Sequence, residues 1–160
     1  MDNIYKLIGK ICADFESLDL VLSGTVNKLV TEDPKVGAII TSEMPFKNLV
    51  NAFSSLIQHK YEGQNDLVME VNKLVKLFNE AEEKRNQTIH SAYGKEVDSD
   101  NDGLPVRIKL TARQKHGLKI TQRTLSETEL KDIDNLIVRT IQELFSLYNH
   151  LFDGEQMKIG

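Results

Sequence analysis

The sequence predicts an all-α protein, an antiparallel bundle of four to five helices with a small β-hairpin inserted before the last helix. Apolar residues recur at three- and four-residue spacing over most of the chain, which is the pattern of helices that bury one stripe. Residues 105–124 change to a period of two, which is typical of strands. The 160 residues, 40% hydrophobic and 28% charged, suit one domain spanning residues 1–160 and argue against a disordered or membrane protein.

The first half of the chain predicts three helices. The first runs over about residues 3–30 with Asp2 as its N-cap, and Pro34 starts a short helix that continues to Thr41. A longer helix follows Ser42 and stops at Gly63. The buried stripe of the first helix consists of Ile4, Ile8, Ile11, Phe15, Leu18 and Leu22, and that of the longer helix consists of Phe46, Leu49, Val50, Phe53 and Leu56.

The second half begins with a long helix from near Gln64, which we expect to close by Gly94. An acidic loop over residues 95–105 leads into the hairpin. In its first strand Val106, Ile108 and Leu110 alternate with Arg107 and Lys109, so the hairpin has one apolar and one basic face. The last helix should then start with a capping box formed by Ser126 and Glu129, with Leu125 and Leu130 as the hydrophobic staple, and end at Gly154.

The end of the helix that starts near Gln64 holds an unusual group of polar residues. Asn86 and His90 are four residues apart and lie on one face of the helix, with Glu82 one turn earlier. Arg85 instead continues the apolar stripe that includes Phe78. A guanidinium on such a stripe needs a partner or an opening into a polar cleft.

An arginine, a polar residue, three further residues and a histidine, late in a helix of an all-helical chain, resemble the signature of the HEPN superfamily (higher eukaryotes and prokaryotes nucleotide-binding). The likeness covers nearly the whole chain and includes Ser91 and Tyr93 after the histidine. It implies a metal-independent RNase whose cleft is shared across a homodimer, with a role in defence or as a toxin. Lys84 departs from the acidic residue common before the arginine. Tyr93 stands three residues after the histidine rather than two, so the modified tyrosine of the toxin branch is not carried over.

The residues of the motif suit cleavage of RNA by its own 2′-hydroxyl, a reaction that needs a base, an acid and positive charge on the phosphorane. Histidine is the side chain best suited to take or give a proton near neutral pH, so His90 is the candidate acid or base, Arg85 can hold two phosphate oxygens, and Asn86 can orient the imidazole or bind phosphate. We therefore expect Arg85, Asn86 and His90 to be catalytic, with no metal and no other cofactor. One imidazole cannot easily serve as both acid and base, so two copies of the chain are expected to share the cleft.

The hairpin segment concentrates positive charge. Between Leu104 and Leu125 there are six basic residues and no acidic one, so the chain's net charge of −4 leaves −10 for the rest. Either this segment binds the RNA backbone, or it is the solvated face of an edge ribbon on which lysines prevent aggregation. The candidate RNA-binding residues are Arg107, Lys109, Arg113, Lys115, Lys119 and Arg123.

Three functional hypotheses remain open from the sequence. The first is the homodimeric endoribonuclease, with RNA as substrate and an antitoxin or defence protein as a further partner. The second is a non-catalytic binding or oligomerisation module in which Arg85 pairs with an acid and His90 is a cation at the helix C-terminus. The third is a nucleotide-binding regulator.

Other signals are weak. Asp98, Asp100, Asp102 and Gly103 match the first half of a calcium loop, but Lys109 occupies the position of its last acidic ligand, which favours a flexible acidic loop. Cys12 is the only cysteine, which excludes an internal disulfide and a cysteine-rich zinc site. With no secretory signal and no membrane-spanning stretch in view, we expect a cytoplasmic location and no membrane contact.

Overall fold

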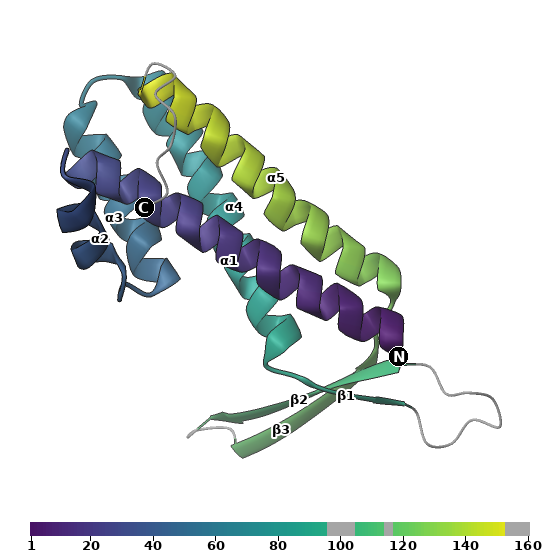
Figure 1. The fold of residues 1–160 in the computed structure, drawn as a ribbon. Helices are drawn as coiled ribbons and strands as arrows, with labels where there is room; N and C mark the ends of the chain where they lie inside the picture. The colour runs from purple at the N-terminus through teal and green to yellow at the C-terminus, as the bar shows by residue number, and fades with distance from the viewer. Residues whose placement is uncertain (96–104, 114–116, 153–160) are drawn as a thin grey trace.

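The computed structural model describes residues 1–95, 105–113 and 117–152, except for the side chains of residues 111–113. It confirms a mostly helical protein with a small antiparallel sheet inserted before the last helix (Figure 1). The elements are α1 (Asp2–Val30), α2 (Pro34–Thr41), α3 (Phe46–Lys60), α4 (Asn65–Ile89), β1 (Ala92–Lys95), β2 (Pro105–Arg113), β3 (Gly117–Thr124) and α5 (Glu127–Leu151).

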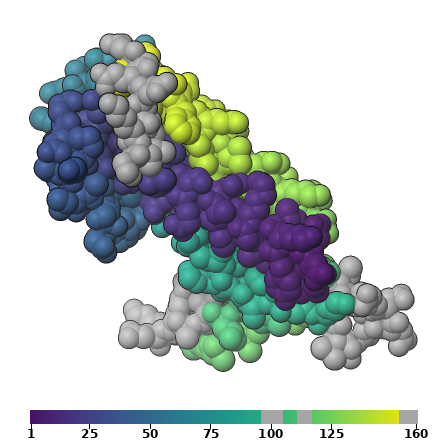
Figure 2. All heavy atoms as spheres, viewed as in Figure 1, coloured from purple at the N-terminus to yellow at the C-terminus, as the bar shows by residue number. Residues whose placement is uncertain are grey.

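Three long helices, α1, α4 and α5, form the body of the bundle, and α2 and α3 pack beside it at one end (Figure 1). The sheet lies at the other end, and Figure 2 shows α1 as a ridge whose N-terminal end lies above it. In the described part of the chain, no helix is long and apolar enough to cross a membrane. The largest fully buried side chains are Phe53, Phe78, Ile11, Leu18, Leu22, Leu29, Leu49, Ile57, Leu125, Leu130, Ile137 and Leu144.

Side-chain caps start two of the helices. The Asp33 carboxylate accepts a hydrogen bond of 2.9 Å from the backbone N–H of Lys35 at the start of α2. The Ser126 hydroxyl accepts one of 3.0 Å from the backbone N–H of Glu129, which confirms the Ser126 half of the expected capping box; the Glu129 carboxylate instead pairs with Arg123. The expected cap of α1 is wrong, because α1 begins at Asp2 and Met1 is the capping residue. The Asp2 carboxylate thus lies in the first turn, where the helix dipole favours negative charge.

The motif-bearing helix closes before Gly94, as expected, since α4 ends at Ile89, but residues 92–95 form a strand, β1, that the sequence did not predict. The hairpin is therefore two strands of a three-stranded antiparallel sheet in the order β1-β2-β3. Ala92 pairs with Ile108, and Lys95 pairs with Pro105. The strand was missed because its four residues are too few to show a period of two, and its pairing partner is distant in sequence.

The two faces of the sheet meet different surroundings. Tyr93, Arg107 and Arg123 are cross-strand neighbours and share one face. This face turns toward the helices, because Tyr93 packs against the core and Arg107 is 9% exposed. The opposite face carries Leu110 and its cross-strand partner Ile120, and both are largely exposed. The alternation predicted from sequence is present: the basic face is covered by the bundle at Arg107, while Lys119 and Arg123 on the same face stay exposed.

A polar cluster joins α1 to α5 within the otherwise apolar interface. The Lys10 ammonium lies 2.7 Å from an Asp14 carboxylate oxygen and 2.5 Å from one of Asp134. Burial raises the pKa of Asp134, and its hydrogen bond from Lys10 opposes that rise. The cluster therefore fixes the contact of the two helices by an ion pair that is largely protected from water on the Asp134 side.

Candidate functional site

Arg85 lies on α4 and reaches across to α1. One guanidinium nitrogen donates a hydrogen bond of 3.2 Å to Glu16, and the other terminal nitrogen donates one of 3.0 Å to the side-chain oxygen of Asn86. The guanidinium carbon lies 4.9 Å from the centre of the Phe15 ring, within cation–π range. The side chain is 22% exposed, so its polar end reaches solvent beside Glu16. The apolar stripe of α4 thus opens into a polar edge at Arg85.

The charge around Arg85 is mainly acidic. Burial raises the pKa of Asp19, repulsion from Glu16 adds to the rise, and attraction to Arg85 offsets part of it. The negative charge of Glu82 raises the pKa of Asp19 further, so Glu82 belongs to the same group of acidic residues around Arg85. One Asp19 carboxylate oxygen and the Nε of Arg85 are buried without a hydrogen-bond partner in the described residues. Arg85 therefore partly compensates two nearby carboxylates, those of Glu16 and Asp19.

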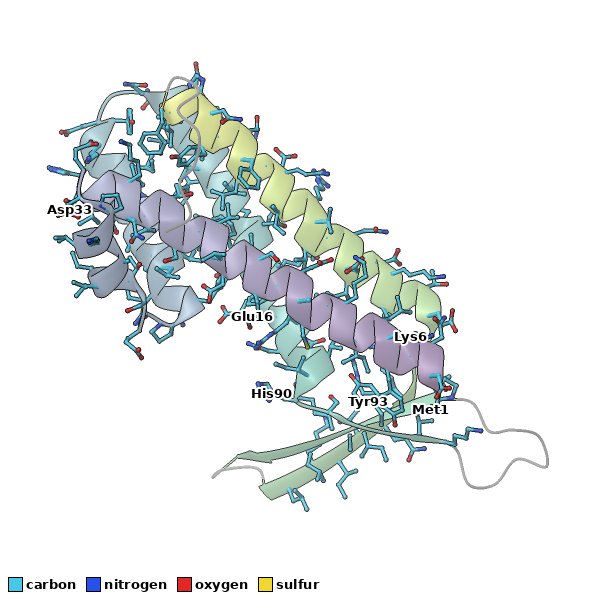
Figure 3. All side chains as sticks on the ribbon, viewed as in Figure 1. Met1, Lys6, Glu16, Asp33, His90 and Tyr93 are labelled. Carbon is cyan, nitrogen blue, oxygen red and sulfur yellow. The ribbon has the colours of Figure 1, made fainter. Side chains whose placement is uncertain are left out.

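His90 is the capping residue at the C-terminal end of α4, and its backbone N–H donates to the carbonyl of Asn86 at 3.2 Å. Its side chain is exposed, and Figure 3 shows it at the end of α4 beside the sheet. Within the described part of the chain, the imidazole forms no hydrogen bond with Arg85, Asn86 or any other side chain. The structure brings Arg85 and Asn86 into contact and leaves the imidazole open to solvent one turn later.

Two side chains close the helix end that carries His90. The Ser91 hydroxyl donates a hydrogen bond of 2.7 Å to the Gln87 carbonyl, and the Tyr93 hydroxyl donates one to the Thr88 carbonyl. These bonds satisfy carbonyls that a helix end leaves without a backbone partner. Burial raises the pKa of the Tyr93 phenol, which is consistent with its place between β1 and the core. The backbone on both sides of the His90 imidazole is therefore held in place.

The candidate RNA-binding residues are not equivalent. Glu129 on α5 pairs with Arg123 at 2.6 Å and with the buried Arg107 at 3.8 Å, so these two cations are partly neutralised. Lys109 is half-buried, and Lys119 is exposed on β3. The remaining two candidates fall outside the description: the Arg113 side chain and the whole of Lys115. Of the described set, Lys119 is the residue most open to a phosphate.

An open groove with a volume of about 480 Å³ lies where α4, the end of β3 and the start of α5 meet. Its charged lining is mixed, with Lys84 and Arg123 facing Glu80, Glu129 and Asp132. None of Arg85, Asn86 and His90 lines it. The groove is thus separate from the predicted catalytic residues, and its excess of acidic groups does not favour a phosphate.

Sequence reasoning missed the residues of α1 that complete the surroundings of Arg85. Phe15 was assigned to the core stripe, which is correct, and Glu16 and Asp19 were not singled out. The signal that points to them is Arg85 itself, because an arginine on an apolar stripe indicates an acid on a facing helix. The sequence does not specify which turn of which helix supplies that acid.

A metal site has no support in the described residues, which contain no group of three His, Cys, Asp or Glu side chains placed to hold an ion. The acidic segment from Asp98 to Gly103, which matches half a calcium loop, lies outside the described residues. Cys12 is a free, half-buried thiol on α1.

No protein family, curated protein or solved structure matches this chain.

Proposed function

We propose that this chain is a metal-independent endoribonuclease of the HEPN type that cleaves RNA by transesterification. The observation that carries the proposal is the exposed His90 imidazole, which has no hydrogen bond or ion pair with another described side chain and lies about one helical turn after Asn86, the residue next to Arg85. The Arg85-Asn86 pair supports it, since the amide oxygen of Asn86 holds the guanidinium at 3.0 Å. The spacing of the three residues is that of the motif this chain resembles.

The roles of the three side chains follow from their chemistry. The neutral His90 imidazole takes the proton of the ribose 2′-hydroxyl, whose oxygen attacks the adjacent phosphorus. The 5′-oxygen leaves and takes up a proton, and a 2′,3′-cyclic phosphate remains. The Arg85 guanidinium binds the phosphate oxygens as their charge increases. To do so it exchanges its 3.2 Å contact with Glu16 for one with the substrate, while Asn86 keeps it oriented.

A second copy of the chain supplies the missing acid. In an in-line displacement, the proton donor for the leaving oxygen stands opposite the base, a place that the same His90 does not reach. A twofold axis beside α4 places two His90 and two Arg85 side chains in one cleft. Lys119 on β3 then contributes nonspecific attraction for the RNA backbone.

The test is incubation of mixed RNA with the purified chain in EDTA, followed by gel electrophoresis and analysis of the product ends. We expect cleavage with cyclic phosphate ends, and a loss of at least about a hundredfold in His90→Ala. His59→Ala is the matched control, because His59 is an exposed histidine near the C-terminal end of α3. Cleavage that persists in His90→Ala with unchanged helicity would remove His90 from the mechanism.

A second candidate function is a non-catalytic binding or oligomerisation module. The contact of Arg85 with Glu16 and its position over the Phe15 ring favour it, because both occur within one chain and stabilise the α1–α4 packing. This function predicts no RNA cleavage under any condition tested above. A chain that stays monomeric at micromolar concentration also favours the module, because the nuclease needs two copies.

The cellular role proposed for the nuclease is defence or toxicity in a reducing cytoplasm, with an antitoxin or defence protein as partner. The single free Cys12 is compatible with that compartment. Growth arrest upon expression of the wild-type chain, and normal growth with the His90→Ala variant, are the expected outcome. Equal growth of the two strains would contradict the toxin role without bearing on cleavage itself.

A further inference from the structure

The sheet leaves one apolar face without a partner in the described residues. Leu110 is 63% exposed, Leu118 66% and Ile120 63%. Leu110 and Ile120 are a direct cross-strand pair, and Leu118 is two residues from Ile120, so the three lie together. We refer to these three side chains as the sheet patch. Three adjacent large aliphatic side chains form one contiguous apolar patch, and patches of this kind are often interaction sites.

The sheet patch belongs to a face that carries no charge. Its other described members are Ile108, Gln122 and Thr124, together with Ala92, Gly94 and the buried Val106 at the end of the sheet where β1 pairs with β2. The charged residues of the same strands, among them Lys109 and Lys119, alternate onto the opposite face. Two copies can therefore meet through this face without like-charge repulsion, whereas the basic face would repel its own copy.

From these observations we infer that the sheet patch docks against the sheet patch of a second copy of this chain, so that two sheets stack face to face. The contact is isologous, since the same residues meet on both sides of a twofold axis. Sheets that pack in this way lie about 10 Å apart, with the inner side chains interdigitated. This contact goes beyond the proposed nuclease cleft, because it uses the side of the sheet away from the helices.

The size of the face fits such a pairing. The three side chains expose roughly 350 Å² per copy, and with Ile108, Gln122 and Thr124 the two faces together bury about 1,000 Å². That is the lower limit for a specific interface, so association in the micromolar range is expected. A lipid surface is a poorer match, because the cations that would meet lipid headgroups lie on the opposite face of the sheet.

The experiment is to measure the molar mass of the full chain by sedimentation equilibrium over the micromolar range. The wild type should contain at least two chains, and Leu110→Lys together with Ile120→Lys should halve the mass without changing helicity. Ile39→Lys is the matched control, because Ile39 on α2 is 77% exposed and lies at the other end of the bundle. It should leave the mass unchanged.

Three outcomes would overturn the inference: a wild-type chain that stays monomeric at tens of micromolar, a double variant with wild-type mass, or an equal effect of Ile39→Lys. A further experiment is flotation of the chain with vesicles of anionic phospholipid. A monomeric wild type that floats with the vesicles, when the double variant does not, would assign the sheet patch to a membrane surface instead. The double variant should still cleave RNA, because the proposed cleft on α4 does not use the sheet patch, so failure of this contact and failure of the nuclease are distinguishable.

Discussion

Arg85 on α4 and Glu16 on α1 form an ion pair of 3.2 Å, although 69 positions separate them in the sequence. The guanidinium also lies over Phe15, the residue next to Glu16. The arginine therefore contributes to the packing of α1 against α4, whether or not it also acts on a substrate. Experiments on Arg85 should separate these two contributions.

Replacement of Arg85 by Ala should lower the free energy of unfolding by about 1–2 kcal/mol, because the cation–π contact and the packing on Phe15 are lost. Glu16→Gln should cost less than about 0.5 kcal/mol, because Glu16 is exposed and surface ion pairs contribute little. Urea denaturation of both variants measures the difference. A loss above about 4 kcal/mol for Arg85→Ala would indicate a fully desolvated charge network instead.

Asp19→Asn should make the chain more resistant to urea at neutral pH. Burial and the nearby Glu16 raise the pKa of Asp19 above its ordinary value of 3.8, so the folded chain holds this proton more tightly than the unfolded chain does. Ionisation of Asp19 therefore destabilises the fold, and the effect is absent below pH 3.8 and complete above the raised pKa. The urea midpoints of wild type and variant should coincide in acid and separate as the pH rises. If the difference between the two urea midpoints became smaller as the pH rises, ionisation of Asp19 would not destabilise the fold.

Tyr93→Phe should destabilise the chain by about 1 kcal/mol, since it removes the hydroxyl that bonds the Thr88 carbonyl and keeps the ring in the core. The amide signals of residues 88–92 should show faster hydrogen exchange, because the end of α4 loses one of its two side-chain closures. Ser91→Ala removes the other closure and should act on the same amides. Unchanged exchange there in both variants would show that these hydroxyls do not hold the helix end.

Gly37→Ala and Gly9→Ala should act in opposite directions. A Cβ at position 37 would lie 2.9 Å from the Cβ of Asn27, so α2 would have to move away from α1, at a cost of about 1–3 kcal/mol. A Cβ at position 9, an exposed position in the N-terminal third of α1, meets nothing within 4 Å, and Ala there should stabilise by about 0.5–1 kcal/mol. Thermal melts of the two variants give the comparison. Stabilisation by both substitutions would mean that the α1–α2 contact adjusts without strain.

The helices could be predicted from the sequence because each buries a continuous stripe of apolar residues. Ile11, Phe53 and Phe78 were placed on such stripes, and all three are fully buried. Helix caps were predictable where a side chain accepts a hydrogen bond from a backbone N–H in the first turn of the helix, as at Ser126. These features are local, and periodicity records them directly.

The contacts between elements were not predictable in the same way. The pairing of β1 with β2, the partner of Arg85 on α1 and the direction of the basic face depend on how distant segments meet. Alternation along β2 shows that the strand has two faces, but it does not specify which one turns toward the helices. In this chain Arg107 turns inward and Leu110 outward, against the usual hydrophobic preference.

The hydrogen bonds of Ser91 and Tyr93 to the end of α4 also affect how the molecule responds to heat. Of the described side chains in the three strands, only Val106 and Arg107 are buried, so the sheet should detach at a lower temperature than that at which the bundle melts. Tyr93 belongs to β1, and fraying of β1 releases its hydroxyl from Thr88. Any reaction that relies on His90 should therefore cease on warming while circular dichroism still reports an intact bundle.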